Sequence, residues 1–183
     1  MAACFAAGST CFLVAPFPGF VNLVGAEADA ITFFVGSILF TSGGALQVLL
    51  SRRDRRSPGG GRAAWWVAVI QSAGTVFFNV STYQALHTTL SNPAYDRLVW
   101  RPDAFGSICF LVSGAIGFAA ADRRWWQPTI NLLGCVLFGI SAIAGYVVPE
   151  SGSMLDLAAA NWNTAAGAAC FLACALPGIR RIG

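Results

Sequence analysis

Apolar residues dominate six stretches of the chain, and polar or charged residues are gathered between them. Each stretch is long enough, or nearly so, to cross about 30 Å of hydrocarbon as a helix that rises about 1.5 Å per residue. We therefore predict an all-α integral membrane protein with six transmembrane helices. The predicted segments are 2–24, 30–50, 64–84, 104–121, 126–148 and 158–179.

A shorter pattern recurs inside these stretches: a Gly, then Phe four residues later, then a small residue three positions further on. Chance placement of 20 Gly and 14 Phe predicts about 1.5 Gly-x-x-x-Phe pairs, whereas the chain has seven, at least one in every segment. These positions share one helix face, where Gly and the small residue let neighbouring backbones approach closely in lipid. The predicted helix-packing glycines are Gly8, Gly36, Gly74, Gly106, Gly134 and Gly167.

A longer repeat groups the segments in pairs. The stretches "WWVAVIQSAG" (65–74) and "WWQPTINLLG" (125–134) resemble each other, whereas segments 2, 4 and 6 begin with acidic or amide residues. We therefore expect a single membrane domain built from three related helical hairpins. Their expected bounds are 1–51, 62–121 and 125–179, with an Arg/Gly-rich cytoplasmic loop at 52–62.

Composition and charge support a membrane location. The chain is 56% hydrophobic and 10% charged, whereas a soluble domain is about a quarter charged. Between the segments, nine Arg and two Asp fall on one side, and two Arg and six acidic residues fall on the other. The positive-inside rule then places both termini in the cytoplasm, in a bacterial inner membrane. The partition predicts no charge at mid-membrane, and it makes membrane lipids the expected partners of loop 52–62.

The residue inventory argues against an enzyme. The chain has no Lys, one His and no C-x-x-C pair among its six Cys, and it lacks the common hydrolase, phosphate-binding and metalloprotease motifs. Proton- or sodium-coupled carriers commonly use membrane-embedded acids, and none is expected here. We predict a non-enzymatic protein with no metal site, no cofactor and no nucleic-acid partner.

The longest connection, after segment 3, carries the first candidate site. Its two Arg are the only cations on the outer side, which favours an outward-facing site for an anion, a lipid headgroup or a partner. The alternative, which the excess of acids favours, is that these Arg pair with neighbouring acids and hold the connection against the bundle. The candidate residues are His87, Tyr95, Asp96, Arg97, Trp100, Arg101 and Asp103.

Amides and hydroxyls inside the segments form a second candidate set. Interhelical hydrogen bonds between such groups contribute about 0.6–2 kcal/mol in membranes, and this structural role is the favoured interpretation. The alternative is that they line a path for water or a small polar solute. The set comprises Gln47, Gln71, Asn79, Ser81, Asn131, Ser141, Asn161 and Asn163, in which Gln71 and Asn131 occupy equivalent repeat positions.

Four stretches carry a family resemblance: "FFVGSILFTSGGALQ", "FNVSTY", "YDRLVWRPDAFGSICF" and "WWQPTINLLGCVLFGISAIAGYVVP". They resemble bacterial, especially actinobacterial, membrane proteins of the YrhK-like family, which are built from G-S-x-x-F helical hairpins. The resemblance spans most of the chain but rests on packing motifs. It implies a fold, and it implies no activity or site residue.

Two functions follow as hypotheses. The first is an accessory component of a membrane complex, which binds a membrane-protein partner or a second copy of the chain. The second is a channel or carrier for a small uncharged solute, an anion or a lipid, with Arg97 and Arg101 at its outer mouth and Gln71, Asn79 and Asn131 along its path.

Overall fold

The structure, a computed structural model, describes residues 1–55, 61–87, 90–121 and 126–180. Within these ranges the regular secondary structure is helical, apart from one isolated antiparallel bridge between Val147 and Met154. Five of the described helices are long and apolar enough to cross a membrane, or six if a bent N-terminal pair counts as one span. The prediction of an all-α protein with multiple candidate membrane spans is confirmed.

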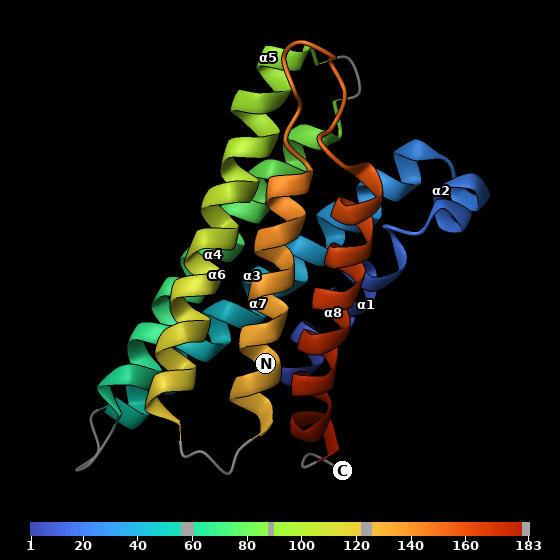
Figure 1. The fold of residues 1–183 in the computed structure, drawn as a ribbon. Helices are drawn as coiled ribbons and strands as arrows, with labels where there is room; N and C mark the ends of the chain where they lie inside the picture. Colours follow the sequence, from blue (N-terminus) through green and yellow to red (C-terminus); the bar gives the residue numbers. More distant parts are fainter. Residues whose placement is uncertain (56–60, 88–89, 122–125, 181–183) are drawn as a thin grey trace.

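Six helices form a closed ring in the described part of the chain, because each packs against two neighbours and α1 also packs against α8 (Figure 1). Chain neighbours are ring neighbours throughout, as short connections favour. The elements in chain order are α1 (Ala2–Val14), α2 (Pro18–Val24), α3 (Ala26–Arg55), α4 (Arg62–Ala85), α5 (Asn92–Tyr95), the π-helix η1 (Asp96–Trp100), α6 (Arg101–Ala120), α7 (Trp126–Ala144) and α8 (Leu157–Arg180).

The first predicted segment, 2–24, is not one straight helix. It divides into α1 and α2, which are bent by 92° relative to each other. Phe17 has an extended backbone (φ −78°, ψ 128°) between Pro16 and Pro18, and proline both lacks an N–H and disfavours helix in the preceding residue. With 13 residues, α1 is about 20 Å long, which is shorter than the hydrocarbon core.

The connection before segment 4 is also different from the prediction. Residues 92–103 were expected in a connection, but Asn92–Ala120 forms one 29-residue helical span through α5, η1 and α6. The wider turn of η1 ends at Trp100, shortly before Pro102, which has no N–H to donate to the carbonyl four residues earlier. The π turn therefore accommodates the proline inside a continuous helix.

Each repeat glycine lies at a close approach between two consecutive membrane helices. A Cβ built on Gly74 would lie 3.0 Å from the carbonyl oxygen of Gly106, and one built on Gly106 would lie 3.1 Å from that of Gly74. In each of the other two helix pairs, a Cβ built on one glycine lies close to the carbonyl oxygen of the other, so backbone contacts at glycine join α1 to α3, α4 to α6 and α7 to α8. These are the pairs that correspond to the three expected hairpins. The corresponding glycines are Gly8 and Gly36, and Gly134 and Gly167.

Six phenylalanine rings, one from each helix of the ring, form the centre of the molecule. We call them the phenylalanine layer. Their exposed fractions lie between 1 and 7%, and neighbouring ring centroids are 5.2–6.4 Å apart, as in stacked and edge-to-face aromatic pairs. The members are the six repeat phenylalanines, Phe12, Phe40, Phe78, Phe110, Phe138 and Phe171.

The Arg-rich connections lie largely outside the described residues. Of the predicted loop 52–62, the structure describes 52–55 and 61–62. Arg123, Arg124 and Arg181 lie outside the described residues. We call the end of the ring that carries Arg52, Arg53 and Arg62 the arginine end. The opposite end, with α5 and the connection from α7 to α8, is the acidic end (Figure 1).

Candidate functional site

Two polar cavities lie inside the ring, on opposite sides of the phenylalanine layer. Residues from α1, α3, α4, α7 and α8 line the first, and residues from all six helices line the second. Phe40 and Phe171 border the first cavity, whereas Phe12 and Phe138 border the second. These four rings contact one another in a closed cycle, at 5.3–6.0 Å between centroids. The cavities therefore share the ring axis and are separated by aromatic rings.

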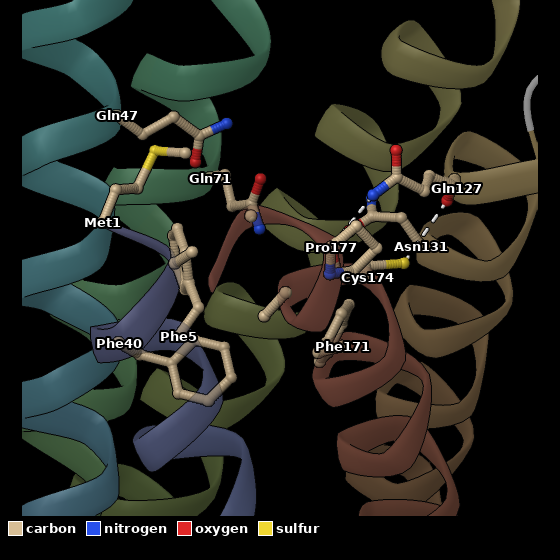
Figure 2. Close-up of a pocket in the computed structure, with 13 residues that line it drawn as sticks. Met1, Phe5, Phe40, Gln47, Gln71, Gln127, Asn131, Phe171, Cys174 and Pro177 are labelled. Atoms are coloured by element: carbon tan, nitrogen blue, oxygen red, sulfur yellow. Dashed lines mark hydrogen bonds between the residues drawn. The ribbon is translucent and has the colours of Figure 1, made fainter. Parts of the chain in front are cut away.

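The first cavity, which we call the amide cavity, has a volume of about 270 Å³ and lies toward the arginine end. Gln47 and Gln71 lie on one side of it, and Gln127 and Asn131 lie across from them (Figure 2). Met1 and Gly178 also line it, so both ends of the described chain are near its mouth. An apolar helical ring thus encloses a cluster of four side-chain amides.

The hydrogen bonds of these amides are incompletely satisfied. Gln127 donates from Nε2 to the carbonyl of Cys174 at 3.1 Å, and Asn131 makes only a long contact of 3.9 Å to Cys135 Sγ. Gln71 is 7% exposed and has no hydrogen-bond partner among the described residues. Leaving a buried amide unpaired costs about 1–3 kcal/mol, so the cavity favours a polar occupant.

The same amides border a second hollow between α4, α6 and α7. This side hollow has a volume of about 280 Å³, and its walls include Val67, Gly114 and Gly117. Phe118, half of whose surface is exposed on the outside of the ring, also lines it. The amide cluster is therefore accessible from the flank of the ring as well as from the arginine end.

The second cavity, which we call the acidic cavity, has a volume of about 310 Å³. It lies at the acidic end and combines aromatic walls with hydroxyl, amide and carboxyl groups. Trp100 is fixed there because its Nε1 donates to the carbonyl of Ala142 at 2.8 Å and its ring packs on Tyr146 with centroids 4.9 Å apart. Polar and aromatic residues that line it include Phe12, Asp29, Phe33, Ser81, Thr82, Tyr95, Trp100, Asp103, Phe138, Ser141, Asn161 and Thr164.

Two carboxyl groups line this cavity, and each lies in the first turn of a helix. Asp29 belongs to α3 and Asp103 to α6, and both lie within helices long enough to span a membrane. From the sequence both were assigned to the outer surface, because each is near the start of an apolar segment. Helix α3 in fact begins at Ala26, and the α6 span begins at Asn92, so both acids lie inside helices.

The predicted Arg-lined mouth is absent from the described lining of the acidic cavity. Arg97 and Arg101 are exposed and do not line it. Arg101 instead pairs with Asp96, with 3.2 Å between Nη2 and Oδ2, which is the pairing expected as the alternative. His87 is exposed and packs edge-on against Tyr83. Of the outer candidates, only Tyr95, Trp100 and Asp103 line the cavity.

The predicted intramembrane polar set divides among three places. Gln71 and Asn131 line the amide cavity, and Ser81 and Asn161 line the acidic cavity. Asn79 donates to Thr41 Oγ1 at 2.9 Å and so joins α4 to α3 outside both cavities. Asn163 donates to the carbonyl of Ala159 within its own helix, at 2.8 Å. The last two therefore have structural roles.

Sequence reasoning missed Gln127 and gave Asp29 no role in a site. Gln127 directly follows the second Trp-Trp pair, at the start of a predicted segment. A signal was present in its spacing, because Gln127 and Asn131 are four residues apart and share a helix face. For Asp29, the helical pattern gives no comparable signal at the first turn of a segment.

No group of three or more His, Cys, Asp or Glu side chains among the described residues has the arrangement of a metal site. Comparisons of the chain with protein-family models, curated proteins and solved structures find no match. Membership of the YrhK-like family therefore stays a hypothesis.

Proposed function

We propose that this multi-pass helical membrane protein is a non-enzymatic channel or carrier, which passes a small polar solute along the axis of its helical ring. One observation carries the proposal: two polar cavities lie on one axis, on opposite sides of a single aromatic layer. A protein that served only to pack against partners has no need of internal polar cavities. The Gln71 amide, which lines the amide cavity and has no described side-chain partner, further supports a solute-binding role.

In this proposal the phenylalanine layer is the gate, and the described conformation is closed. Hydrophobic constrictions close channels because water does not wet them. Passage requires the rings to move apart.

The orientation of the ring is a further part of the proposal. The arginine end faces the cytoplasm by the positive-inside rule, so the acidic cavity opens to the outside. The outer surface of the ring is rich in exposed Val, Ile, Leu and Phe, such as Ile108, Val112 and Ile140, which contact lipid tails. Membrane lipids are therefore the proposed surroundings of all six helices.

An accessory role in a membrane complex is the second candidate. The observation that favours it is the continuity of the phenylalanine layer, which leaves both cavities blind in the described conformation. In that case the exposed flanks of the ring bind a membrane-protein partner or a second copy of the chain. The cavities then contain only water.

Solute uptake by liposomes that contain the purified protein separates the two candidates. Light scattering follows urea and glycerol, and radiolabel follows methylammonium. We expect wild-type protein to exceed empty vesicles for at least one of these solutes. Gln71→Leu removes the unpaired amide and lowers that uptake about fivefold or more, whereas Arg97→Ala, outside both cavities, leaves it unchanged. Wild-type uptake equal to that of empty vesicles overturns the transport proposal in favour of the accessory role.

A further inference from the structure

The acidic cavity holds hydrogen-bond acceptors that no described residue satisfies. Asp29 Oδ1 is buried and has no hydrogen-bond partner. Ser81 is 5% exposed, lines the cavity and makes no side-chain hydrogen bond to any described residue. Asp103, from the opposite hairpin, likewise makes no hydrogen bond or ion pair in the described part of the chain. Three polar groups from α3, α4 and α6 thus line one cavity, and none of them has a side-chain hydrogen bond that the described residues supply.

The two carboxyl groups also have no cationic side chain beside them in the described lining. Arg101 lies at the same end of the ring, but it is exposed and pairs with Asp96 instead. A carboxylate is costly to hold in a low-dielectric cavity, so carboxyl groups there are protonated, paired or bound to a ligand of opposite sign. These features indicate a positively charged ligand.

The walls and size of the cavity distinguish among cations. Calcium takes six to eight oxygen ligands and magnesium takes six, and no metal-like group of three acidic, His or Cys side chains occurs among the described residues. The volume of about 310 Å³ is that of a small organic molecule. Phe12, Phe33 and Trp100 line the cavity, and aromatic faces attract organic cations and accommodate their alkyl groups.

We propose that the acidic cavity binds a small organic ammonium ion. Its positive nitrogen donates hydrogen bonds to the carboxylates of Asp29 and Asp103 and to the Ser81 hydroxyl, and its alkyl part packs on the aromatic walls. This assignment rests on the proposed function, because the ammonium ion is then the solute that the channel or carrier takes up at its acidic end. It replaces the anion expected from Arg97 and Arg101.

The test is calorimetric titration of the full-length protein in nanodiscs of zwitterionic lipid. The probes are butylammonium and its neutral analogue 1-butanol, and titration of empty nanodiscs is subtracted. We expect saturable binding of butylammonium to one site per chain, and no saturable binding of 1-butanol. Equal binding of the two probes, or no binding of butylammonium, overturns the proposal.

Isosteric variants locate the site. Asp29→Asn and Asp103→Asn each remove one charge and lower the affinity for butylammonium about tenfold or more, because hydrogen bonds to charged groups are the strong ones. Asp96→Asn is the matched control, since Asp96 lies at the same end but outside the cavity, and it changes the affinity less than about twofold. Unchanged binding in both cavity variants, or displacement of butylammonium by stoichiometric calcium, contradicts the assignment.

The two proposals fail in distinguishable ways. Carboxylate-dependent binding of butylammonium, combined with no uptake of any solute into liposomes, preserves the cation site and overturns transport. If Gln71→Leu lowers solute uptake but butylammonium shows no saturable binding, the transport proposal is preserved and the cation site is overturned.

Discussion

At the residue scale, the glycine and the phenylalanine of each repeat contact different neighbours. The ring of Phe78, on α4, packs directly against Gly106 on the paired helix α6. The same ring also packs against Phe138 from another hairpin, with centroids 5.8 Å apart. The glycine therefore determines how close two helices of a hairpin lie, whereas the phenylalanine joins hairpins at the axis. The spacing of four residues predicts their shared helix face. The spacing does not predict that six rings meet at the centre. Residues on one helix face can contact either the adjacent helix or the axis of the ring, and the spacing does not distinguish the two.

The residue that follows each repeat glycine is also buried between helices, which the Gly-x-x-x-Phe spacing does not predict. The exposed fractions at these positions are 0–2%. Small side chains are required there because the helices approach most closely beside the glycine. The six residues are Ser9, Ser37, Thr75, Ser107, Cys135 and Ala168.

Substitution of a repeat glycine tests the close approach of helices. In Gly74→Ala the new Cβ lies 2.9 Å from Cys109 Cβ and 3.0 Å from the Gly106 carbonyl oxygen, so α4 and α6 must move apart. We expect the free energy of unfolding to fall by about 1–3 kcal/mol. Reversible SDS titration in mixed micelles measures it.

Gly117→Ala is the matched control for Gly74→Ala. Gly117 also lies within a membrane helix, but its nearest neighbour, Val67 Cγ2, is 3.7 Å from the built Cβ, an ordinary contact. We expect a change within about 0.5 kcal/mol. An equal loss in both variants contradicts the assignment of Gly74 to a helix contact.

At the element scale, hydrogen bonds between side chains join one hairpin to the next. Between α3 and α4, Ser37 and Thr82 lie 2.8 Å apart and Asn79 donates to Thr41. The sequence predicted such bonds as a class, since amides and hydroxyls in lipid seek partners. It predicted neither which partners meet nor the break at Pro16–Pro18, because partner choice depends on the rotation of each helix about its axis.

Thr41→Val tests the α3–α4 junction. The variant keeps the shape of the side chain but leaves the Asn79 amide nitrogen without its acceptor. We expect a loss of about 1–2 kcal/mol in the free energy of unfolding, with unchanged solute binding because neither residue lines a cavity. Thr32→Val serves as the control, since the Thr32 hydroxyl bonds only within its own helix, to Ala28 at 2.8 Å. A larger loss in the control than in Thr41→Val is the contrary result.

At the scale of the whole molecule, the ring closes through the contact of α1 with α8. Hydropathy predicted helices and hairpins, but it carries no information on which first and last helices meet. The cavities depend on that closure, because residues from five or six helices line each one. This is why the sequence identified Gln71, Asn131, Ser81 and Asp103 as polar candidates yet could not assign them to opposite cavities.

The orientation of the ring is testable by labelling whole cells with a membrane-impermeant maleimide. Ser151→Cys places a thiol in the exposed connection at the acidic end, and Arg53→Cys places one at the arginine end. We expect Ser151→Cys to be labelled above the background of the six native cysteines, and Arg53→Cys to be labelled only after permeabilisation. The reverse pattern overturns the cytoplasmic assignment of the arginine end.

The central claim is that a single aromatic layer divides one continuous axis. Uptake of methylammonium by liposomes tests it most directly, with Phe138→Ala compared with Phe118→Ala. Phe138 belongs to the layer and borders the acidic cavity, whereas Phe118 lies half exposed on the outside of the ring. We predict that Phe138→Ala, eluting as folded protein in gel filtration, raises uptake about tenfold or more above wild type, because removal of a gating ring connects the two cavities. Uptake by folded Phe138→Ala that equals that of wild type and of Phe118→Ala contradicts the account.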